Sequence, residues 1–325
     1  MRNLVAGVDG GGTRTRVAVA TAAGELLGIG EAGSGNLHDI GASALAENLD
    51  SAVAQAFEKA GRITQQLDAV FLGLGSIVTE EDRAAIRQIV AAAPWAPQSA
   101  IGVDHDLRIA HMGCLGGAPG IVLIAGTGSS CYGRDAEGRS WKSGGWGPLL
   151  DDLGSGHWLG RQAMIAAIRE SDGRGPTTSL SGAVLSELGV TTPLHLLHRV
   201  EMTGLSRAEI ASLSRLVVDA AKQGDGVARA ILDRGAAELA DLAAAVAAKL
   251  GMADPRTAVH VSATGGLVEA GEHFLAPLRS ALAQRLPRAE FIPAKAPPVL
   301  GAVMLAAEML RQTPVNREFL ARLLA

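Results

Sequence analysis

The feature of this sequence that most constrains its fold is a run of three glycines, Gly10 to Gly12, between two apolar segments. Residues 4–8 before the glycines are strand-like, and residues 16–21 after them alternate with a period of two, which is typical of a strand. A P-loop needs Gly-Lys-Ser/Thr leading into a helix, and a dinucleotide-binding GxGxxG turn also opens a helix. Neither pattern follows here, so the sequence predicts a glycine turn within a β-hairpin.

The same pattern returns further along the chain. Residues 120–124 predict a strand, 125–129 a glycine turn and 130–133 a second strand. The turns that follow the two hairpins, at 21–25 and 135–139, also correspond. An internal repeat of this length predicts two related domains.

The rest of the chain alternates strand-like and helical segments, which is typical of an α/β fold. The expected helices cover 43–59, 79–93, 154–170, 180–188, 206–222, 225–250 and 298–311, and the expected further strands cover 69–72, 100–103, 258–262 and 290–293. A third glycine turn, Thr264-Gly265-Gly266, follows the strand at 258–262.

Composition and charge exclude several classes of protein. The net charge is −4 with acids and bases interspersed, so no nucleic-acid or membrane-surface partner is expected. No apolar run reaches the ~18 residues of a membrane span, and no signal peptide is expected. Cys114 and Cys131 have no CxxC spacing, which argues against a disulfide scaffold or a structural zinc site. We therefore expect a cytoplasmic protein.

The glycine turns are suited to phosphate binding. Glycine lets the main chain approach an anion without a Cβ in the way, and adjacent N–H groups with Thr or Ser hydroxyls then bind the oxygens. Taken alone, such a turn is more often a plain hairpin or helix-entry turn than a binding site. Three such turns in one chain, two of them related by the repeat, favour a nucleotide site.

Asp9 to Thr15, DGGGTRT, resembles the first phosphate motif of the sugar kinase, actin and heat-shock chaperone superfamily. Gly126 to Ser129 resembles its second phosphate motif, and Thr264 to Gly266 its adenosine motif. The resemblance assigns nucleotide binding to Gly11, Gly12, Thr13, Thr15, Gly126, Thr127, Gly128, Ser129, Gly265 and Gly266.

A more specific resemblance is carried by GGWG at 144–147, followed by Asp152 and Gly154-Ser155. It is similar to the GGWG…GDEGS signature of the N-acetylglucosamine kinase group, which is joined to the BadF/BadG-type ATPases, and the resemblance covers nearly the whole chain. It implies two ribonuclease-H-like domains of the actin-like ATPase type, with a nucleotide cleft between them. ATP and Mg²⁺ are the implied cofactors. Relatives are often homodimers, but the sequence does not fix the oligomeric state.

For this chain, the resemblance implies an N-terminal domain of residues 1–116 plus 300–325, with the first phosphate motif and the sugar contacts. Residues 117–299 are expected to form the C-terminal domain, with helical insertions and with the second phosphate and adenosine motifs.

Phosphate transfer to a sugar hydroxyl needs in-line placement of the reactants and a carboxylate that accepts the hydroxyl proton. Asp104, His105 and Asp106 follow a predicted strand and precede a predicted helix. The family has an Asn-Asp pair at this point, so the resemblance assigns Asp106 as the catalytic base, with His105 where Asn is usual. Asp104 is the rival base, and either aspartate could be an ordinary helix N-cap.

Asp9 ends the first strand and is expected to lie near the metal, because a carboxylate beside the phosphates is a typical Mg²⁺ ligand. A turn aspartate is the alternative. The resemblance assigns the sugar contacts to Asn36, Gly145, Trp146 and Asp152. Asn36 and Asp152 could instead cap turns, whereas a tryptophan between glycines is untypical of a core position.

One departure from the family pattern affects the acceptor site. Where the family commonly has Gly-Asp-Glu-Gly, this chain has Asp151-Asp152-Leu153-Gly154. The contact of that glutamate to sugar or metal is therefore lost. Three interpretations stay open: Asp151 compensates, the acceptor is not N-acetylglucosamine, or the glutamate is structural.

We expect an ATP-dependent kinase that transfers the γ-phosphate to a hydroxyl, most simply the 6-hydroxyl, of an amino sugar such as N-acetylglucosamine or glucosamine. One alternative is a BadF/BadG-type ATPase that activates a reductase, but such activators need cysteines for an iron–sulfur cluster, and Cys131 falls in a predicted strand. A nucleotide-binding regulator without catalysis is the other alternative, because of Leu153. The sequence does not identify the acceptor, since a methyl-sized change in a pocket alters discrimination by only about 1–3 kcal/mol.

Overall fold

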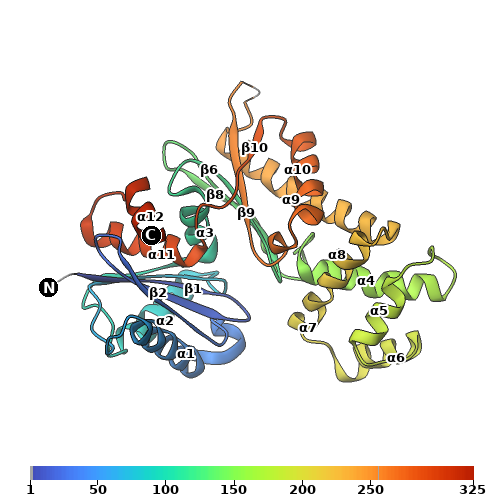
Figure 1. Ribbon diagram of the computed structural model, residues 1–325, viewed down its shortest axis with the longest axis horizontal. Helices are drawn as coiled ribbons and strands as arrows, with labels where there is room; N and C mark the ends of the chain where they lie inside the picture. The colour runs from blue at the N-terminus through green and yellow to red at the C-terminus, as the bar shows by residue number, and fades with distance from the viewer. Residues whose placement is uncertain (1–2, 255) are drawn as a thin grey trace. The chain divides into compact units, whose positions relative to one another are not determined.

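The computed structural model describes residues 3–254 and 256–325. The chain divides into two compact units. Unit 1 consists of Met1–Pro119 with Pro293–Ala325, and unit 2 consists of Gly120–Ile292. Each unit contains one five-stranded sheet with helices packed on it (Figure 1). The functional domain boundaries expected after residues 116 and 299 stay a prediction.

The sheet of unit 1 has the strand order β3-β2-β1-β4-β5. β1 (Leu4–Gly10), β2 (Thr15–Thr21) and β3 (Leu26–Ala32) form the antiparallel meander that the hairpin pattern predicts. β4 (Ala69–Leu74) and β5 (Ile101–His105) continue the sheet in parallel with β1. The carboxyl ends of β1, β4 and β5 therefore lie at the same edge, which is where ligands bind in open α/β sheets.

Helices cover both faces of this sheet (Figure 1). α1 (Leu37–Lys59) and α2 (Glu80–Ala91) pack on one face, against one buried apolar cluster. α3 (Asp106–Leu115), α11 (Pro298–Arg311) and α12 (Arg317–Leu324) pack on the other face, against a second cluster. The strands contribute alternate residues to the two clusters, as a pleated sheet buried on both faces requires.

α11 approaches β1 and α3 so closely that only glycine fits between them. A Cβ on Gly7 would lie 2.3 Å from the backbone nitrogen of Val303, and a Cβ on Gly301 would lie 2.1 Å from the carbonyl oxygen of Ile109. Non-bonded carbon atoms pack at about 3.5–4.0 Å, so no larger side chain fits without moving the backbone. These contacts fix β1, which carries Asp9, and α3, which begins with Asp106.

The sheet of unit 2 has the strand order β10-β9-β6-β7-β8. β6 (Gly120–Ala125), β7 (Ser129–Arg134) and β8 (Ser140–Gly144) form an antiparallel meander. β9 (Val259–Thr264) and β10 (Ala289–Phe291) continue the sheet in parallel with β6. The two sheets have the same topology, with β6 to β10 in the places of β1 to β5. The repeat that the glycine turns indicate therefore extends to the whole sheet.

Unit 2 also holds a large helical part. Its helical elements are α4 (Gly156–Ser171), α5 (Leu180–Glu187), α6 (Pro193–His198), the π-helical turn η1 (Arg199–Thr203), α7 (Arg207–Ser212), α8 (Ser214–Lys222), α9 (Gly226–Leu250), the 3₁₀ turn η2 (Val268–Ala270) and α10 (Glu272–Arg285). A single buried apolar cluster includes residues of this helical part and of the sheet.

Several elements differ from the sequence prediction, among them α1, the pair α7 and α8, and β8. α1 begins at Leu37 and not at residue 43, because the helical segments on either side of Gly41, whose φ is 78°, join into one. The continuous helix predicted over 206–222 is two helices that meet at Leu213, where ψ is −15°. β8 was not predicted, because its sequence SWKSG is mostly exposed and lacks an apolar alternation.

Across residues 3–254 and 256–325, no helix combines the length and the apolar character that a membrane crossing requires.

Candidate active site

The first phosphate turn of unit 1 is held by backbone hydrogen bonds from two other loops. The nitrogen of Gly75, after β4, donates to the carbonyl oxygen of Gly10 at 2.9 Å. The nitrogen of Gly35, before α1, donates to the carbonyl oxygen of Gly11 at 2.9 Å. Within the turn, the nitrogen of Gly11 donates to the carbonyl oxygen of Arg14 at 2.9 Å. The turn is therefore preorganised by segments that are distant in sequence.

The outer part of this turn is accessible, and its base is buried. Gly12 and Thr13 are exposed. No described atom beyond its chain neighbours lies within 4 Å of a Cβ built on Gly12. Thr15 is buried, and its Oγ1 is one of three buried side-chain oxygens without a hydrogen-bond partner in the described part of the chain. A bare backbone turn above an unsatisfied hydroxyl suits an oxygen-rich ligand.

Two carboxylates lie at this edge of the sheet. Asp9 is the penultimate residue of β1, and Asp106 opens α3 directly after β5. A Cβ on Gly75 would lie 3.3 Å from Oδ2 of Asp106 and 3.8 Å from the carbonyl oxygen of Gly10, so Asp106 lies close to the first phosphate turn.

Burial and the neighbouring charge of Asp106 raise the pKa of Asp9 to about 6. The positive charges of Arg16 and Arg14 oppose this rise and are outweighed. Asp9 lies close enough to Asp106 to feel its charge, so the two carboxylates form a site of concentrated negative charge, which favours a bound cation.

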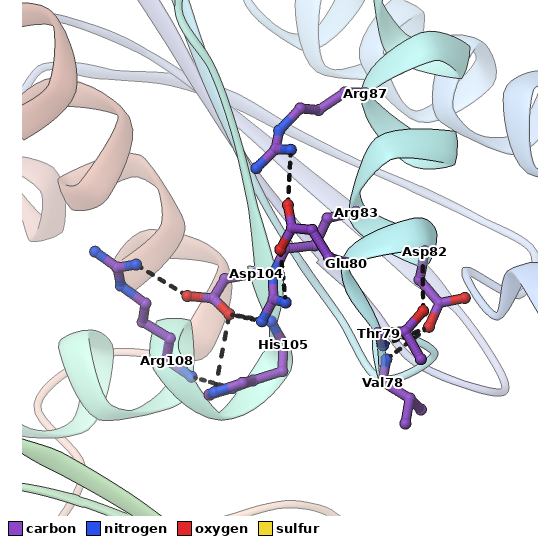
Figure 2. A network of polar contacts seen from close by, with 9 residues as sticks. All are labelled: Val78, Thr79, Glu80, Asp82, Arg83, Arg87, Asp104, His105 and Arg108. Carbon is purple, nitrogen blue, oxygen red and sulfur yellow. Dashed lines mark hydrogen bonds and ion pairs between the residues drawn. The ribbon is translucent and has the colours of Figure 1, made fainter.

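Asp104, the rival base, is fully engaged in a polar network (Figure 2). Arg83 of α2 donates to its Oδ1 at 3.1 Å, and Arg108 of α3 donates to its Oδ2 at 2.9 Å. Burial raises the pKa of Asp104, but the bonds from Arg108, His105 and Arg83 outweigh burial and hold this pKa below its ordinary value. A carboxylate stabilised in its charged form by two guanidinium groups is a poor proton acceptor.

His105 takes a structural role at the start of α3. Its Nδ1 accepts a hydrogen bond from the backbone nitrogen of Arg108 at 3.2 Å, so the imidazole is the N-cap of the helix. Asp106 is then the first residue of the helix, not its cap. Asn is also a good N-cap, which gives a physical reason why His and Asn can exchange at this position.

Asn36 is the N-cap of α1. Its side-chain oxygen accepts a hydrogen bond from the backbone nitrogen of His38 at 3.1 Å, and its backbone nitrogen donates to Oγ of Ser34 at 3.1 Å. Capping uses the oxygen of the amide, whereas the amide nitrogen carries two separate donors. Asn36 can therefore cap the helix and still donate to a ligand.

In unit 2, the second phosphate turn is joined to the start of α4. The backbone nitrogen of Gly156 donates to the carbonyl oxygen of Gly126 at 2.8 Å. The backbone nitrogen of His157 donates to the carbonyl oxygen of Thr127 at 3.2 Å. The hydroxyl of Ser129 donates to the carbonyl oxygen of Leu153 at 2.8 Å. The first two N–H groups of α4, those of Gly156 and His157, therefore hold the second phosphate turn.

The adenosine turn lies beside the second phosphate turn, because β6 and β9 are paired. Gly265 has a φ of 110°, and a Cβ on it would lie 2.5 Å from the carbonyl oxygen of Ala125. That oxygen accepts a hydrogen bond from the nitrogen of Leu267 at 3.0 Å. Only glycine permits this close approach of the two turns.

The segment with Gly145 and Trp146 is an exposed turn of unit 2. Gly145 and Gly147 have φ values of 76° and 85°, which place the indole of Trp146 at the surface with 74% of it exposed. The backbone nitrogen of Trp146 donates to Asp151 at 3.3 Å. Trp146 is therefore not a core residue, as a tryptophan between glycines predicts, and its contact with a sugar stays a prediction.

Asp152 is buried, and both of its carboxylate oxygens have partners within unit 2. Oδ1 accepts a hydrogen bond from the backbone nitrogen of Ser129 at 3.1 Å, and Oδ2 accepts one from Arg207 at 2.5 Å. Sequence reasoning did not find Arg207. The SRAE capping box marks only the start of α7, and nothing local in the sequence connects it with a residue so far upstream.

The predicted residues therefore gather in two groups, one in each unit. Unit 1 brings together the first phosphate turn, Asn36, Asp9 and Asp106, and unit 2 brings together the second phosphate turn, the adenosine turn and Asp152. No group of three or more His, Cys, Asp or Glu side chains suited to a metal is found within the described residues. Mg²⁺ typically binds through one or two carboxylates, substrate phosphates and water, so Asp9 beside a phosphate turn fits it.

Residues 6–306 match the model of a known protein family, described as the BadF/BadG/BcrA/BcrD ATPase family. The chain belongs to this ATPase family. The BadF/BadG resemblance read from the motifs is thereby confirmed.

Two relatives of this member of the BadF/BadG/BcrA/BcrD family match it over almost their full length. An N-acetylmuramic acid/N-acetylglucosamine kinase of Clostridium acetobutylicum is 32% identical over 302 residues, 93% of this chain and 97% of that protein. An N-acetyl-D-glucosamine kinase of Dictyostelium discoideum is 28% identical over 314 residues, 94% of this chain and 98% of that protein.

A crystal structure of a candidate N-acetylglucosamine kinase from Chromobacterium violaceum has a TM-score of 0.76 with this chain at 28% identity. The match covers 94% of this chain and 99% of that one. The expected fold class, α/β with the topology of actin-like ATPases, is confirmed.

Proposed function

We propose that the chain is an ATP-dependent kinase that transfers the γ-phosphate to the 6-hydroxyl of an amino sugar of the N-acetylglucosamine or glucosamine type. The observation that carries this proposal is the position of Asp106, next to the first phosphate turn, while its rival Asp104 is held by two arginines. The names of the two relatives, both amino-sugar kinases, support the same substrate class.

In this mechanism, Asp106 accepts the proton of the acceptor hydroxyl. The hydroxyl oxygen forms a bond to the γ-phosphorus while the bond from that phosphorus to the β,γ-bridging oxygen breaks, and ADP leaves. A positioned carboxylate of this kind contributes about 10²–10⁴-fold to such a transfer. Phosphoryl transfer depends otherwise on placement and charge stabilisation, which is the work that the turns are suited to do.

The turns divide this work. In the proposal, the backbone N–H groups of Gly12, Thr127 and Gly128 bind phosphate oxygens, and Gly265-Gly266 leaves room for the adenosine. Gly11, Gly126 and Ser129 donate their N–H groups within the protein and so hold the two phosphate turns in shape. Asp9 would hold Mg²⁺, which neutralises phosphate charge when it is bound. The raised pKa of Asp9 in the free protein fits this role, because a carboxylate that is hard to ionise alone gains most from a nearby cation.

Asn36, Gly145 and Trp146 are proposed to contact the sugar. The exposed indole of Trp146 offers an apolar face to a sugar ring, and Asn36 offers amide donors to its hydroxyls. Leu153, where the family pattern has glutamate, leaves the identity of the acceptor open. A cytoplasmic location and a homodimeric state belong to the same proposal.

The test is ADP release with Mg·ATP against N-acetylglucosamine, glucosamine, N-acetylmannosamine, N-acetylmuramic acid and glucose, with a control that contains no sugar. ADP release that depends on an amino sugar supports the proposal and names the acceptor. ADP formed equally without sugar would instead favour an ATPase that activates a partner enzyme. No ADP under any condition would favour a nucleotide-binding regulator.

A further inference from the structure

Asp152 occupies an unusual position in the backbone. Its φ is 58°, in the left-handed region, where non-glycine residues are uncommon. Only 2% of the residue is exposed. A buried carboxylate on a strained backbone is retained only when the surrounding contacts hold it there.

The contacts that hold Asp152 lead to the second phosphate turn and to α7. One oxygen accepts from the backbone nitrogen of Ser129, at the end of the turn, and the other accepts from the guanidinium of Arg207. A Cβ on Gly128 would lie 2.5 Å from Nη2 of Arg207 and 2.9 Å from Oδ1 of Asp152. The Arg207–Asp152 pair therefore lies directly against the turn.

Arg207 itself is carried by a fixed element. The Ser206 side chain and the Glu209 side chain form a reciprocal capping box at the start of α7. α7 also packs tightly on α4, because a Cβ on Gly160 would lie 1.9 Å from the carbonyl oxygen of Ile210. Since α4 also bonds to the turn through Gly156 and His157, the turn is held from two sides.

We propose that Arg207 is a positioning residue for nucleotide binding, which acts through Asp152 to hold the second phosphate turn in its phosphate-binding conformation. This inference rests on the proposed function, since that function assigns the turn to ATP. It assigns Asp152 to the shaping of the second phosphate turn. It also adds Arg207, from the helical part of unit 2, to the residues that support nucleotide binding. The removal of Arg207 leaves a buried carboxylate without its ionic partner, and the turn then loses its fixed shape.

The experiment compares Arg207→Met, Arg207→Lys and a matched control, Arg215→Met. Arg215 is also a partly exposed arginine of unit 2 with a carboxylate partner, but it lies on α8 and its partner, Glu187, lies on α5. The affinity for ADP is measured directly by calorimetry, and kcat and KM are measured for ATP and for the sugar.

We expect Arg207→Met to weaken ADP binding about tenfold or more and to raise KM for ATP similarly, with KM for the sugar within about twofold of wild type. Arg207→Lys keeps the charge and is expected to recover most of the loss. Arg215→Met is expected to bind ADP like wild type. Asp152→Asn combined with Arg207→Met is expected to be no worse than either change alone, because the two residues act as one unit.

ADP affinity within twofold of wild type in folded Arg207→Met, or an equal loss in Arg215→Met, would overturn the inference. Should Arg207→Met fail to fold, Arg207→Lys decides in its place, through a loss of about threefold in ADP affinity that Arg215→Lys does not show. A wild-type protein that binds ADP but shows no sugar-dependent turnover would refute the proposed kinase activity. The ADP affinities of the Arg207 and Arg215 variants would then still decide this inference. A wild-type protein that binds no ADP would refute both.

Discussion

In unit 1, the strand that leads into the glycine turn ends at Asp9-Gly10, whereas in unit 2 the corresponding strand ends at Ile124-Ala125. The last parallel strand of unit 1 runs directly into a helix that opens with Asp106, and its counterpart β10 runs into no helix that opens with a carboxylate. Both units keep the sheet topology and the glycine turn. Both units thus repeat the glycine turn, whereas the carboxylates that we propose for proton transfer and metal binding, Asp106 and Asp9, come from unit 1 alone.

The largest expected effect is a loss of turnover without a loss of nucleotide affinity, caused by a change in unit 1. Asp106→Asn removes the proton acceptor and keeps the shape of the side chain, so we expect sugar-dependent turnover to fall about 10²–10⁴-fold. ADP affinity is expected to stay within about threefold of wild type, because the phosphate turns are unchanged. Steady-state kinetics together with calorimetry measure both quantities. A variant that keeps more than a tenth of wild-type turnover would exclude Asp106 as the base.

The second prediction tests the binding role of unit 2. Gly265→Ala places a methyl group 2.5 Å from the carbonyl oxygen of Ala125, on a backbone with a φ of 110°. Strain of this kind costs about 1–3 kcal/mol, and we expect ADP affinity to fall at least about tenfold.

The matched control for Gly265→Ala is Gly182→Ala, at an open position within α5 where no described atom beyond its neighbours lies within 4 Å of the new Cβ. That change is expected to leave ADP binding unaltered and to raise stability by up to about 1 kcal/mol. Equal ADP affinity in the two variants would show that the adenosine turn is not part of the nucleotide site.

The third prediction concerns Asp104, whose expected role is structural. Asp104→Asn removes the negative charge from the Arg83 and Arg108 contacts, so the free energy of unfolding is expected to fall by about 1–2 kcal/mol at pH 7. Turnover is expected to fall far less than in Asp106→Asn. A loss of turnover as large as that of Asp106→Asn, in a folded variant, would make Asp104 the base.

The same residue gives a pH dependence with a definite sign. The pKa of Asp104 is lower in the folded protein than its ordinary value of 3.8, so the folded state favours the ionised form. Its stabilising contribution is therefore present above about pH 4 and is lost as the pH falls through the folded pKa. We expect wild type and Asp104→Asn to differ in denaturant unfolding at pH 7, and this difference to shrink as the pH falls below about 4. A difference that grows on acidification would contradict this account.

The smallest expected effect concerns the helix cap. His105→Asn replaces one good N-cap with another, so turnover and stability are expected to stay within about twofold and about 0.5 kcal/mol of wild type. His105→Ala removes the cap and is expected to lower stability by about 1 kcal/mol. Turnover and thermal unfolding of the two variants check this order. A large loss of turnover in both variants, with the stability of the Asn variant unchanged, would give the imidazole a chemical role.

Sequence reasoning predicted the hairpins and the glycine turns of both units, because period-two alternation and glycine runs are local properties of the chain. It did not predict β8, whose residues are mostly exposed and show no alternation. It also placed the start of α1 too late, because Gly41 interrupts the pattern without ending the element.

For the site, the resemblance assigned Asp106 as the base, and the sequence alone left Asp104 as a rival. The separation comes from Arg83 of α2 and Arg108 of α3, and the contact with Arg83 exists only once α2 is packed beside β5. Arg207 was missed for the same reason, since its partner Asp152 is brought to it by the fold of the helical insertion. Tertiary contacts between segments distant in sequence leave no local pattern to read.

The measurement that tests the central claim most directly is the position of the phosphate in the product. Wild type and Asp106→Asn are incubated with Mg·ATP and N-acetylglucosamine or glucosamine, and the products are followed by phosphorus NMR with proton coupling. We predict a sugar phosphate whose phosphorus couples to the two C6 protons, formed by wild type and nearly absent with Asp106→Asn. Inorganic phosphate as the only new species, or a sugar phosphate formed equally well by both proteins, would contradict the account.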